Sequence, residues 1–246
     1  IDGEAAGLPD GMRSRLDHDV SVPGGRSLPN ENRGPEAPER SPNPLKQRWV
    51  WDRVSPFINP MCGSGTLAIE AALIATNRRP GLYRTNYAFM HVQGYDENVY
   101  VKEDALLEEQ IVDVPELKVI ATDYSPKAIE NAKKNAIAAG VQKLIEFAVC
   151  DFADTEVPAD AKGIMMVNPE YGERLGDIQE LEATYARIGD FMKQKCGGYF
   201  GYVFTGNMEL AKKIGLKAKR RIEFYNSTID CRLLEYELYS GSRREK

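Results

Sequence analysis

The chain has 246 residues and a mass of 27.5 kDa, so it can bury one sizeable hydrophobic core and still carry an appendage. Its formal net charge of −5 and pI near 5.3 argue against a surface that binds polyanions over its whole area, although they allow a local basic patch. Four scattered cysteines without a C-x-x-C pair, and only two histidines, disfavour a zinc site and a disulfide framework and favour a reducing cytoplasm. No apolar run reaches the roughly 18 residues that span a bilayer, so we expect a cytoplasmic protein without a membrane segment or metal.

Residues 1–48 differ in composition from the rest of the chain. Gly, Pro, Asn, Asp, Glu and Arg dominate there, and such sequence buries too little apolar surface to offset the entropy lost on ordering. We interpret this stretch as an irregular N-terminal extension or as the remnant of a longer N-terminal region. Denser apolar sequence begins at Trp49, and residues 49–246 are predicted to form the main domain.

The main domain opens with a short strand, a glycine turn and a helix. The β-prone residues 54–58 lead towards Gly63-Ser64-Gly65, and the alanine-rich residues 67–75 have the composition of a packed helix. This arrangement offers unpaired amides at a helix N-terminus to a bound small molecule. Alone it is weak evidence for a ligand, because many Gly-x-Gly turns only connect a strand to a helix.

Strands and helices alternate through the sequence that follows. Residues 78–116 are an insert of mixed character, with a short helix predicted at 101–110. Ser125 and Pro126 are the residue types preferred at the N-cap and first position of a helix, and Gly140 is the type that ends one. The predicted strands are 117–122, 144–149, 163–167 and 199–205, and the predicted helices are 126–137, 178–192 and 208–214.

Two closing β segments, 221–225 and 231–239, have no helix between them, which predicts a hairpin at the edge of the sheet. The whole pattern predicts an α/β fold with a mainly parallel sheet, helices on both faces and a C-terminal antiparallel hairpin. In such sheets ligands bind at the carboxyl ends of the strands. Polar residues stand at four successive strand ends, namely Asn59, Asp123, Asp151 and Asn168-Pro169-Glu170-Tyr171.

The two acids suggest a nucleoside-bearing cofactor. Asp123 could accept both hydroxyls of a ribose, and Asp151 could accept a hydrogen bond from the adenine amine. The alternatives are a helix cap for Asp123 and a strand-end turn for Asp151. NADP is disfavoured because no basic residue ends the second strand, and NAD is mildly disfavoured because Ala68 holds the third position of G-x-G-x-x-G.

The motifs together resemble those of the THUMP-associated class I S-adenosylmethionine-dependent methyltransferases, which have a Rossmann-like fold. That group includes the large-subunit ribosomal RNA guanine-N2 methyltransferases and proteins named as N6-adenine-specific methylases. The resemblance covers about residues 54–240. Its motifs are Asn59-Pro60-Met61-Cys62-Gly63-Ser64-Gly65-Thr66, Asn77-Arg78-Arg79-Pro80-Gly81-Leu82, residues 123–140, Asn168-Pro169-Glu170-Tyr171-Gly172-Glu173-Arg174, and Asn226-Ser227-Thr228-Ile229-Asp230-Cys231-Arg232-Leu233.

The resemblance implies a role for each motif. Asn168 and the Pro169 carbonyl would accept hydrogen bonds from the amine of a target base, and Tyr171 would stack on that base. Asp123 would bind the cofactor ribose and Asp151 its adenine amine. Asn59, Gly63 and Gly65 would contact its methionine part, the cofactor site would also include Pro60, Cys62, Thr66, Tyr124 and Phe152, and the substrate site would include Glu170, Arg174, Arg78 and Arg79.

Two departures from the family pattern bear on activity. The family usually has Asp where this chain has Asn59, so we expect weaker cofactor binding rather than its loss. The family tetrapeptide is commonly N-P-P-Y, and Glu170 replaces its second proline, which leaves the choice of base open. The family's N-terminal THUMP and ferredoxin-like region does not resemble residues 1–48, so we expect this chain to be the catalytic portion.

Support for RNA contact within the sequence is local. Arg78 and Arg79 are candidates for phosphate contacts, and the basic residues of 212–221 are more simply interpreted as a solvated helix and turn. We expect a methyltransferase that acts on an exocyclic amine of an RNA base, with guanine N2 of large-subunit ribosomal RNA first. The alternatives are adenine N6 in RNA or DNA, a non-catalytic RNA-binding protein that keeps the fold, and an NAD-dependent oxidoreductase.

Overall fold

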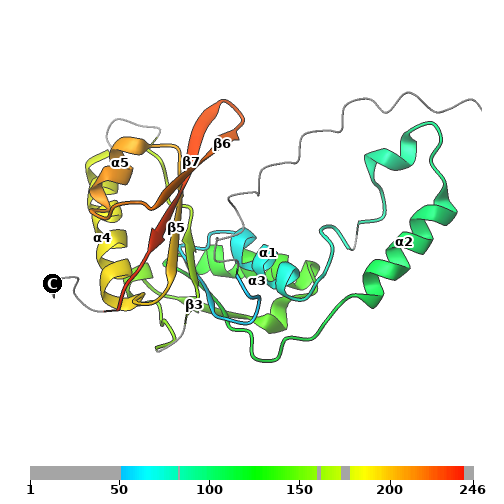
Figure 1. Ribbon diagram of the computed structural model, residues 1–246, viewed down its shortest axis with the longest axis horizontal. Coiled ribbons are helices and arrows are strands. Elements are labelled where there is room, and N and C mark those ends of the chain that lie inside the picture. The colour runs from blue at the N-terminus through cyan, green and yellow to red at the C-terminus, as the bar shows by residue number, and fades with distance from the viewer. Residues whose placement is uncertain (1–50, 83, 160–161, 173–177, 241–246) are drawn as a thin grey trace, which may run out of the picture. The chain divides into compact units, whose positions relative to one another are not determined.

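The computed structural model describes residues 51–82, 84–159, 162–172 and 178–240, and the predicted extension 1–48 lies outside these ranges. Its centre is a seven-stranded sheet in the order β3-β2-β1-β4-β5-β7-β6 (Figure 1). The strands are β1 (Phe57–Pro60), β2 (Val119–Asp123), β3 (Ile145–Val149), β4 (Ile164–Val167), β5 (Phe200–Thr205), β6 (Arg220–Asn226) and β7 (Ile229–Glu237).

The first five strands pair in parallel, and β7 pairs antiparallel with both β5 and β6, as the predicted C-terminal hairpin requires. β1 pairs with both β2 and β4, which makes it the central parallel strand. β7 inserts antiparallel between β5 and β6, so the closing hairpin forms the sheet edge. The order in which strands are added to the sheet reverses at β1, because β2 and β3 lie on one side of it and β4 and β5 on the other. This is the topological switch point at which α/β sheets bind ligands.

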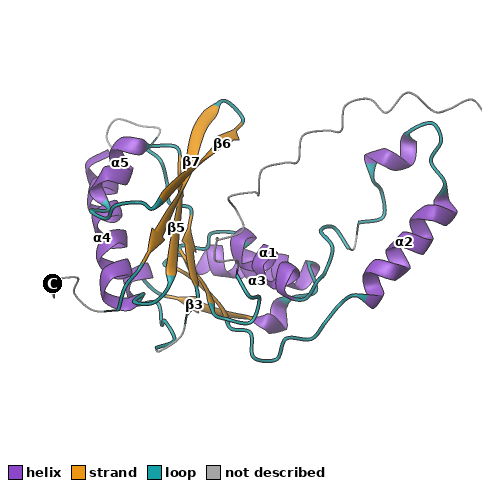
Figure 2. Ribbon diagram, in the orientation of Figure 1, coloured by secondary structure: helices purple, strands orange, loops and turns teal. Residues whose placement is uncertain are grey.

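Helices cover both faces of the sheet. The α-helices are α1 (Thr66–Ala75), α2 (Glu97–Glu109), α3 (Pro126–Ala138), α4 (Ile178–Lys195) and α5 (Met208–Lys213), and short 3₁₀ turns are η2 (Ala88–His91), η3 (Gln142–Leu144) and η4 (Phe152–Asp154). α1 and α3 pack on one face around Val119 and Ala132, and α4 and α5 pack on the other around Tyr185 and Met165 (Figure 2). Two hydrophobic cores therefore sandwich the sheet.

Local chemistry explains where several elements begin. Ser125 caps α3 by accepting from the Ala128 amide, and Pro126 is its first residue, as predicted. β1 begins at Phe57 rather than at residue 54, because the Asp52 carboxylate accepts from the amides of Val54 and Ser55 and holds them in a turn. In the insert, Asp96 caps α2 and moves its start to Glu97, four residues before the predicted one.

α2 contributes no buried residue, whereas every residue of β1 and β2 is buried. Among the residues that the structure describes, no helix is both long and apolar enough to cross a membrane. The carboxyl ends of β1, β2 and β4 meet at one edge of the sheet, and the predicted site residues are found there.

Candidate functional site

The loop of residues 61–65, here called the cofactor loop, makes the turn between β1 and α1. Met61, Gly63 and Gly65 all have left-handed backbone conformations, with φ of 61°, 56° and 83°. A side chain at Gly65 would place its Cβ 2.9 Å from the Cβ of Ala132, so glycine is needed for α1 to approach α3 this closely. Gly65 is the N-cap of α1 and has no side-chain cap, so the first amides of α1 stay available to a ligand.

Asp123 anchors this loop from the end of β2. Its Oδ2 accepts from the Gly63 amide at 3.0 Å, and its Oδ1 accepts from the Ser125 amide at 2.9 Å. Its side chain is buried. Ionised carboxylates have about four lone-pair sites, so Asp123 keeps acceptor capacity for further donors. Burial, together with the charge of Asp123, raises the pKa of the neighbouring Cys62 thiol to about 12 and keeps it protonated.

Asn59 and Pro60 end β1 beneath the cofactor loop. Asn59 is only 1% exposed, and its Nδ2 donates to the Met166 carbonyl of β4 at 2.8 Å. Its Oδ1 is buried and has no hydrogen-bond partner among the described residues. On the outer side of the loop, the Thr66 hydroxyl lies 3.1 Å from that of Ser64.

Asp151 and Phe152 stand at the end of β3, next to Arg187 of α4. Asp151 Oδ1 accepts from Arg187 Nη2 at 2.6 Å and from the Ala153 amide at 2.9 Å. The hydrogen bond from Arg187 holds the pKa of Asp151 below its usual value. The Arg187 guanidinium also lies over the Phe152 ring, 4.7 Å from its centroid. Sequence reasoning missed Arg187, because nothing in the spacing shows which turn of α4 meets β3.

The segment Asn168-Pro169-Glu170-Tyr171 leaves the end of β4 and is fixed by both α4 and α5. The Tyr171 hydroxyl donates to Asn168 Oδ1 at 2.5 Å. The Glu170 carbonyl accepts from the Tyr185 hydroxyl, and the Tyr171 carbonyl accepts from Asn207 Nδ2 at 3.0 Å. Burial raises the pKa of Tyr171 to about 12, so its hydroxyl remains a donor across the neutral and mildly alkaline range.

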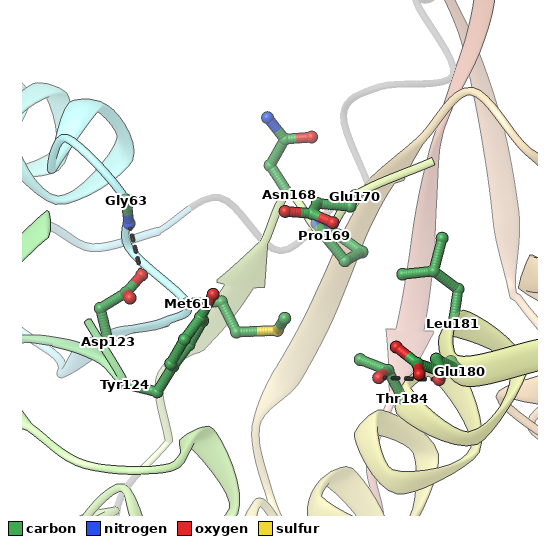
Figure 3. Close-up of a pocket in the computed structure, with 10 residues that line it drawn as sticks. All are labelled: Met61, Gly63, Asp123, Tyr124, Asn168, Pro169, Glu170, Glu180, Leu181 and Thr184. Atoms are coloured by element: carbon green, nitrogen blue, oxygen red, sulfur yellow. Dashed lines mark hydrogen bonds between the residues drawn. The ribbon is translucent and has the colours of Figure 1, made fainter. Parts of the chain in front are cut away.

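A pocket of about 480 Å³ joins these parts. It is lined by Gly63, Asp123 and Tyr124 on one side and by Asn168, Pro169 and Glu170 on the other (Figure 3). Four further lining residues were not predicted, namely Met61, Glu180, Leu181 and Thr184. Three of them come from α4, whose periodicity predicts a buried face but not which of its edges meets the strand ends.

Most of the predicted site residues do not line this pocket, namely Asn59, Pro60, Cys62, Gly65, Thr66, Asp151, Phe152, Tyr171, Arg78 and Arg79. Arg78 and Arg79 follow the far end of α1, a ten-residue helix of about 15 Å that starts at the cofactor loop. The Arg79 guanidinium is ion-paired with Asp104 at 2.5 Å and bonded to the Tyr87 hydroxyl at 2.7 Å. Arg174 lies outside the described residues.

The basic residues of 212–221 mostly have acidic partners, in agreement with the interpretation as a solvated face. These ion pairs are Lys212–Glu209, Lys213–Glu182, Lys219–Glu237 and Arg220–Glu235. Within the described part of the chain, no cluster of three or more His, Cys, Asp or Glu residues has the arrangement of a metal site.

The switch-point pocket, the glycine loop anchored by an acid and the N-P-x-Y segment define the class of Rossmann-like methyltransferase folds. The sequence matches the family described as RMKL-like methyltransferase domain over residues 45–235, and the chain belongs to that family.

Relatives with similar sequences are also named as methyltransferases. Ribosomal RNA large subunit methyltransferase K/L of Syntrophotalea carbinolica is 38% identical over 204 residues, which are 79% of this chain and 28% of that protein. The protein of the same name from Shewanella baltica is 36% identical over 193 residues, 77% of this chain and 27% of that protein. The chain therefore spans little more than a quarter of the length of these relatives.

Two solved structures share the fold and part of the sequence. One is provisionally assigned as a methyltransferase and was solved with SAH; its TM-score is 0.70 at 27% identity, covering 80% of this chain and 51% of that chain. The other is a protein from Listeria monocytogenes predicted to be an N6-adenine-specific DNA methylase. Its TM-score is 0.67 at 32% identity, covering 79% of this chain and 49% of that chain.

Proposed function

We propose that this domain transfers a methyl group from S-adenosylmethionine to the exocyclic amine of an RNA base, with guanine N2 of large-subunit ribosomal RNA as the first candidate. The observation that carries the proposal is the single pocket that has Gly63 and Asp123 on one wall and Asn168 and Pro169 on the other. A methyl donor held on the first wall would face an amine held on the second.

The residues on the cofactor wall, and Asp151 and Asn59 outside the pocket lining, fit S-adenosylmethionine. The carboxylate of Asp123 has acceptor sites left for two ribose hydroxyls after its bonds to Gly63 and Ser125. Asp151 Oδ2 remains for the adenine amine, since the bonds to Arg187 and Ala153 both use Oδ1. The buried, unpartnered Oδ1 of Asn59 suits a donor such as the amine of the methionine part. When bound, this cofactor supplies an electrophilic methyl group on a positively charged sulfur.

The residues on the other wall would hold the target. An exocyclic amine conjugated to its ring is a poor nucleophile, so two acceptors that orient it contribute mainly by positioning. Asn168 Oδ1 and the Pro169 carbonyl supply those acceptors, and a paired base would have to leave its stack to reach them. Asn168 Oδ1 already accepts from Tyr171 but has a second lone pair for the amine.

The choice of large-subunit ribosomal RNA follows the relatives named ribosomal RNA large subunit methyltransferase K/L, and guanine N2 follows the resemblance of the motifs. Adenine N6 is the second candidate, because a structural neighbour at 32% identity is predicted to be an N6-adenine-specific DNA methylase. The N-P-x-Y acceptors fit either amine. A non-catalytic RNA-binding role is the alternative from another class.

Calorimetric titration with S-adenosylmethionine and S-adenosylhomocysteine, with NAD as a control, tests the cofactor assignment. We expect micromolar binding of the first two and none of NAD. The Asp123→Ala variant removes two charge-assisted hydrogen bonds to the ribose and the anchor of Gly63, so we expect its affinity to fall at least about 100-fold. A folded wild-type chain that binds neither sulfur compound would contradict the proposal.

Incubation with ribosomal RNA and isotopically labelled S-adenosylmethionine, followed by nucleoside mass spectrometry, tests the substrate. N2-methylguanosine would support the first candidate and N6-methyladenosine the second. Cofactor binding and RNA binding without any methylated nucleoside would favour the non-catalytic alternative.

A further inference from the structure

The ladder between β1 and β4 stops one bond before the site, and Pro60 is the reason. The register pairs Phe57 with Ile164 and Ile58 with Met165, and the Ile164 amide donates to the Pro56 carbonyl at 2.9 Å. In a parallel sheet the N–H and C=O groups of alternate residues point to the same neighbouring strand, and the Pro56 carbonyl points to β4. The main-chain groups of residues 58 and 60 therefore also point to β4. The next donor would be the amide of residue 60, bonding to the Met166 carbonyl. Proline has no N–H, and the ladder ends there.

The side chain of Asn59 supplies the missing donor. Its Nδ2 donates to that same Met166 carbonyl at 2.8 Å, and the side chain is 1% exposed. Met166 is two residues before Asn168, and Asn59 is two residues before the cofactor loop. The amide therefore joins β1 to β4 at the level where both strands end and their chains continue into the two walls of the pocket.

We infer that Asn59 is a positioning residue, which replaces the main-chain bond that Pro60 cannot make and thereby sets the distance between the cofactor loop and Asn168. The kinetic part of this inference rests on the proposed function, and the structural part does not. Aspartate, the usual residue of the family pattern, could not do this when ionised, because a carboxylate only accepts hydrogen bonds. Asn59 therefore differs from the family's aspartate in two ways: it removes a charge, and it adds a hydrogen bond between β1 and β4.

A double-mutant cycle isolates the link. Asn59→Leu removes the donor and keeps the number and branching of the side-chain heavy atoms, and Pro60→Ala restores a main-chain N–H that can bond to Met166. We expect N59L to lower the melting temperature by about 5 °C, because it leaves a buried carbonyl unpaired. In the P60A background the same substitution should cost less than about 2 °C. Equal losses in both backgrounds would overturn the inference.

Kinetics separate positioning from cofactor binding. N59L should weaken S-adenosylmethionine binding, since Oδ1 is also lost, and should lower kcat at saturating cofactor about tenfold by displacing Asn168. N59L/P60A should recover most of kcat while its cofactor affinity stays as weak as that of N59L. Recovery of affinity without kcat, or no effect of N59L on kcat, would contradict a positioning role. If no methylation is found in the wild type, the melting-temperature cycle alone decides, so failure of the proposed function is distinguishable.

Asn59→Asp gives an independent test through pH. Burial raises the pKa of a carboxyl at this position above its unfolded value near 3.9, because the charged form loses hydration. Only the protonated form can donate to Met166. The N59D fold therefore binds more protons than its unfolded chain, and its stability falls as pH rises through the raised pKa. We expect the melting-temperature deficit of N59D relative to wild type to grow between pH 5 and pH 8. A deficit that does not change with pH would overturn the inference.

Discussion

The two walls of the pocket are built differently. On the cofactor wall the Asp123 carboxylate accepts hydrogen bonds from two main-chain amides. One amide belongs to Ser125, two residues later in the chain, and the other to Gly63, which follows the adjacent strand β1. On the base wall the acceptor Asn168 is exposed, and its Oδ1 is bonded to the Tyr171 hydroxyl. The segment that carries it is held by Tyr185 of α4 and by Asn207, the N-cap residue of α5, both later in the chain.

This difference indicates which of the two walls has to rearrange when its ligand binds. On the cofactor wall the Asp123 carboxylate is held by the amides of Gly63 and Ser125, so we expect cofactor binding to need no rearrangement of Asp123. The base wall has to admit a planar base beside Tyr171 and share the Asn168 oxygen with a second donor. We expect cofactor affinity to be independent of RNA, and target binding to depend on the contacts of α4 and α5.

The largest effect that separates the two walls is expected from Asn168→Ala. It removes one of the two acceptors for the target amine, and loss of one such preorganised contact costs about 10²–10³ in kcat. The affinity for S-adenosylmethionine should stay within about twofold of wild type, because no contact on the cofactor wall changes. Asn131→Ala, at an exposed position of α3, is the matched control and should keep both values. A loss of cofactor affinity in N168A would show that the walls are not independent.

Substitutions of Tyr171 divide the base wall further. Tyr171→Phe keeps the ring and removes the hydrogen bond to Asn168, so we expect kcat to fall about fivefold, the equivalent of one ordinary hydrogen bond. Tyr171→Ala also removes the stacking surface, worth about 1–3 kcal/mol per base, and should cost about 100-fold in kcat/KM.

The pH dependence is a second measurement on the same residue. Because the pKa of Tyr171 is raised to about 12, the wild-type rate should show no inflection from this hydroxyl up to pH 10.

Equal rates for Y171F and Y171A would exclude a stacking role.

The contrast between the walls also explains what the sequence could predict. Strand ends, the glycine turn and the cap of α3 depend on near neighbours in the chain, and Asn59, Asp123 and Asn168 were therefore placed at the correct strand ends. Strand β1 was predicted to start too early, because the turn-forming carboxylate of Asp52 has no periodic signature.

The contributions of α4 could not be predicted, because they depend on how a helix lies over the strand ends. Glu180, Thr184 and Arg187 belong to that helix, and their sequence neighbours suggest only an amphipathic surface. The link from Asn59 to Met166 spans 107 positions in sequence and needs the register of two strands to be known. Tertiary packing, rather than local pattern, sets these contacts.

Arg187→Ala gives the smallest effect and tests whether α4 also tunes the cofactor wall. Both members of the Arg187–Asp151 pair are about half exposed, at 50% and 41%, so the pair contributes at most about 1 kcal/mol to stability. We expect a two- to threefold loss of S-adenosylmethionine affinity at pH 7, because Asp151 loses the partner that orients it.

The pH dependence of R187A has a definite sign. Arg187 lowers the pKa of Asp151, so this pair adds stability above the unfolded pKa near 3.9 that is lost as pH falls through the lower folded pKa. Without Arg187, Asp151 protonates at a higher pH and stops accepting from the adenine amine sooner. Titration calorimetry from pH 7 to pH 4 should therefore show affinity falling earlier in R187A than in wild type. Arg187→Lys is the control: it keeps the charge but not the planar stack on Phe152, so its affinity should depend on pH as in wild type. Coincident pH profiles of R187A and wild type would mean that α4 does not act on Asp151.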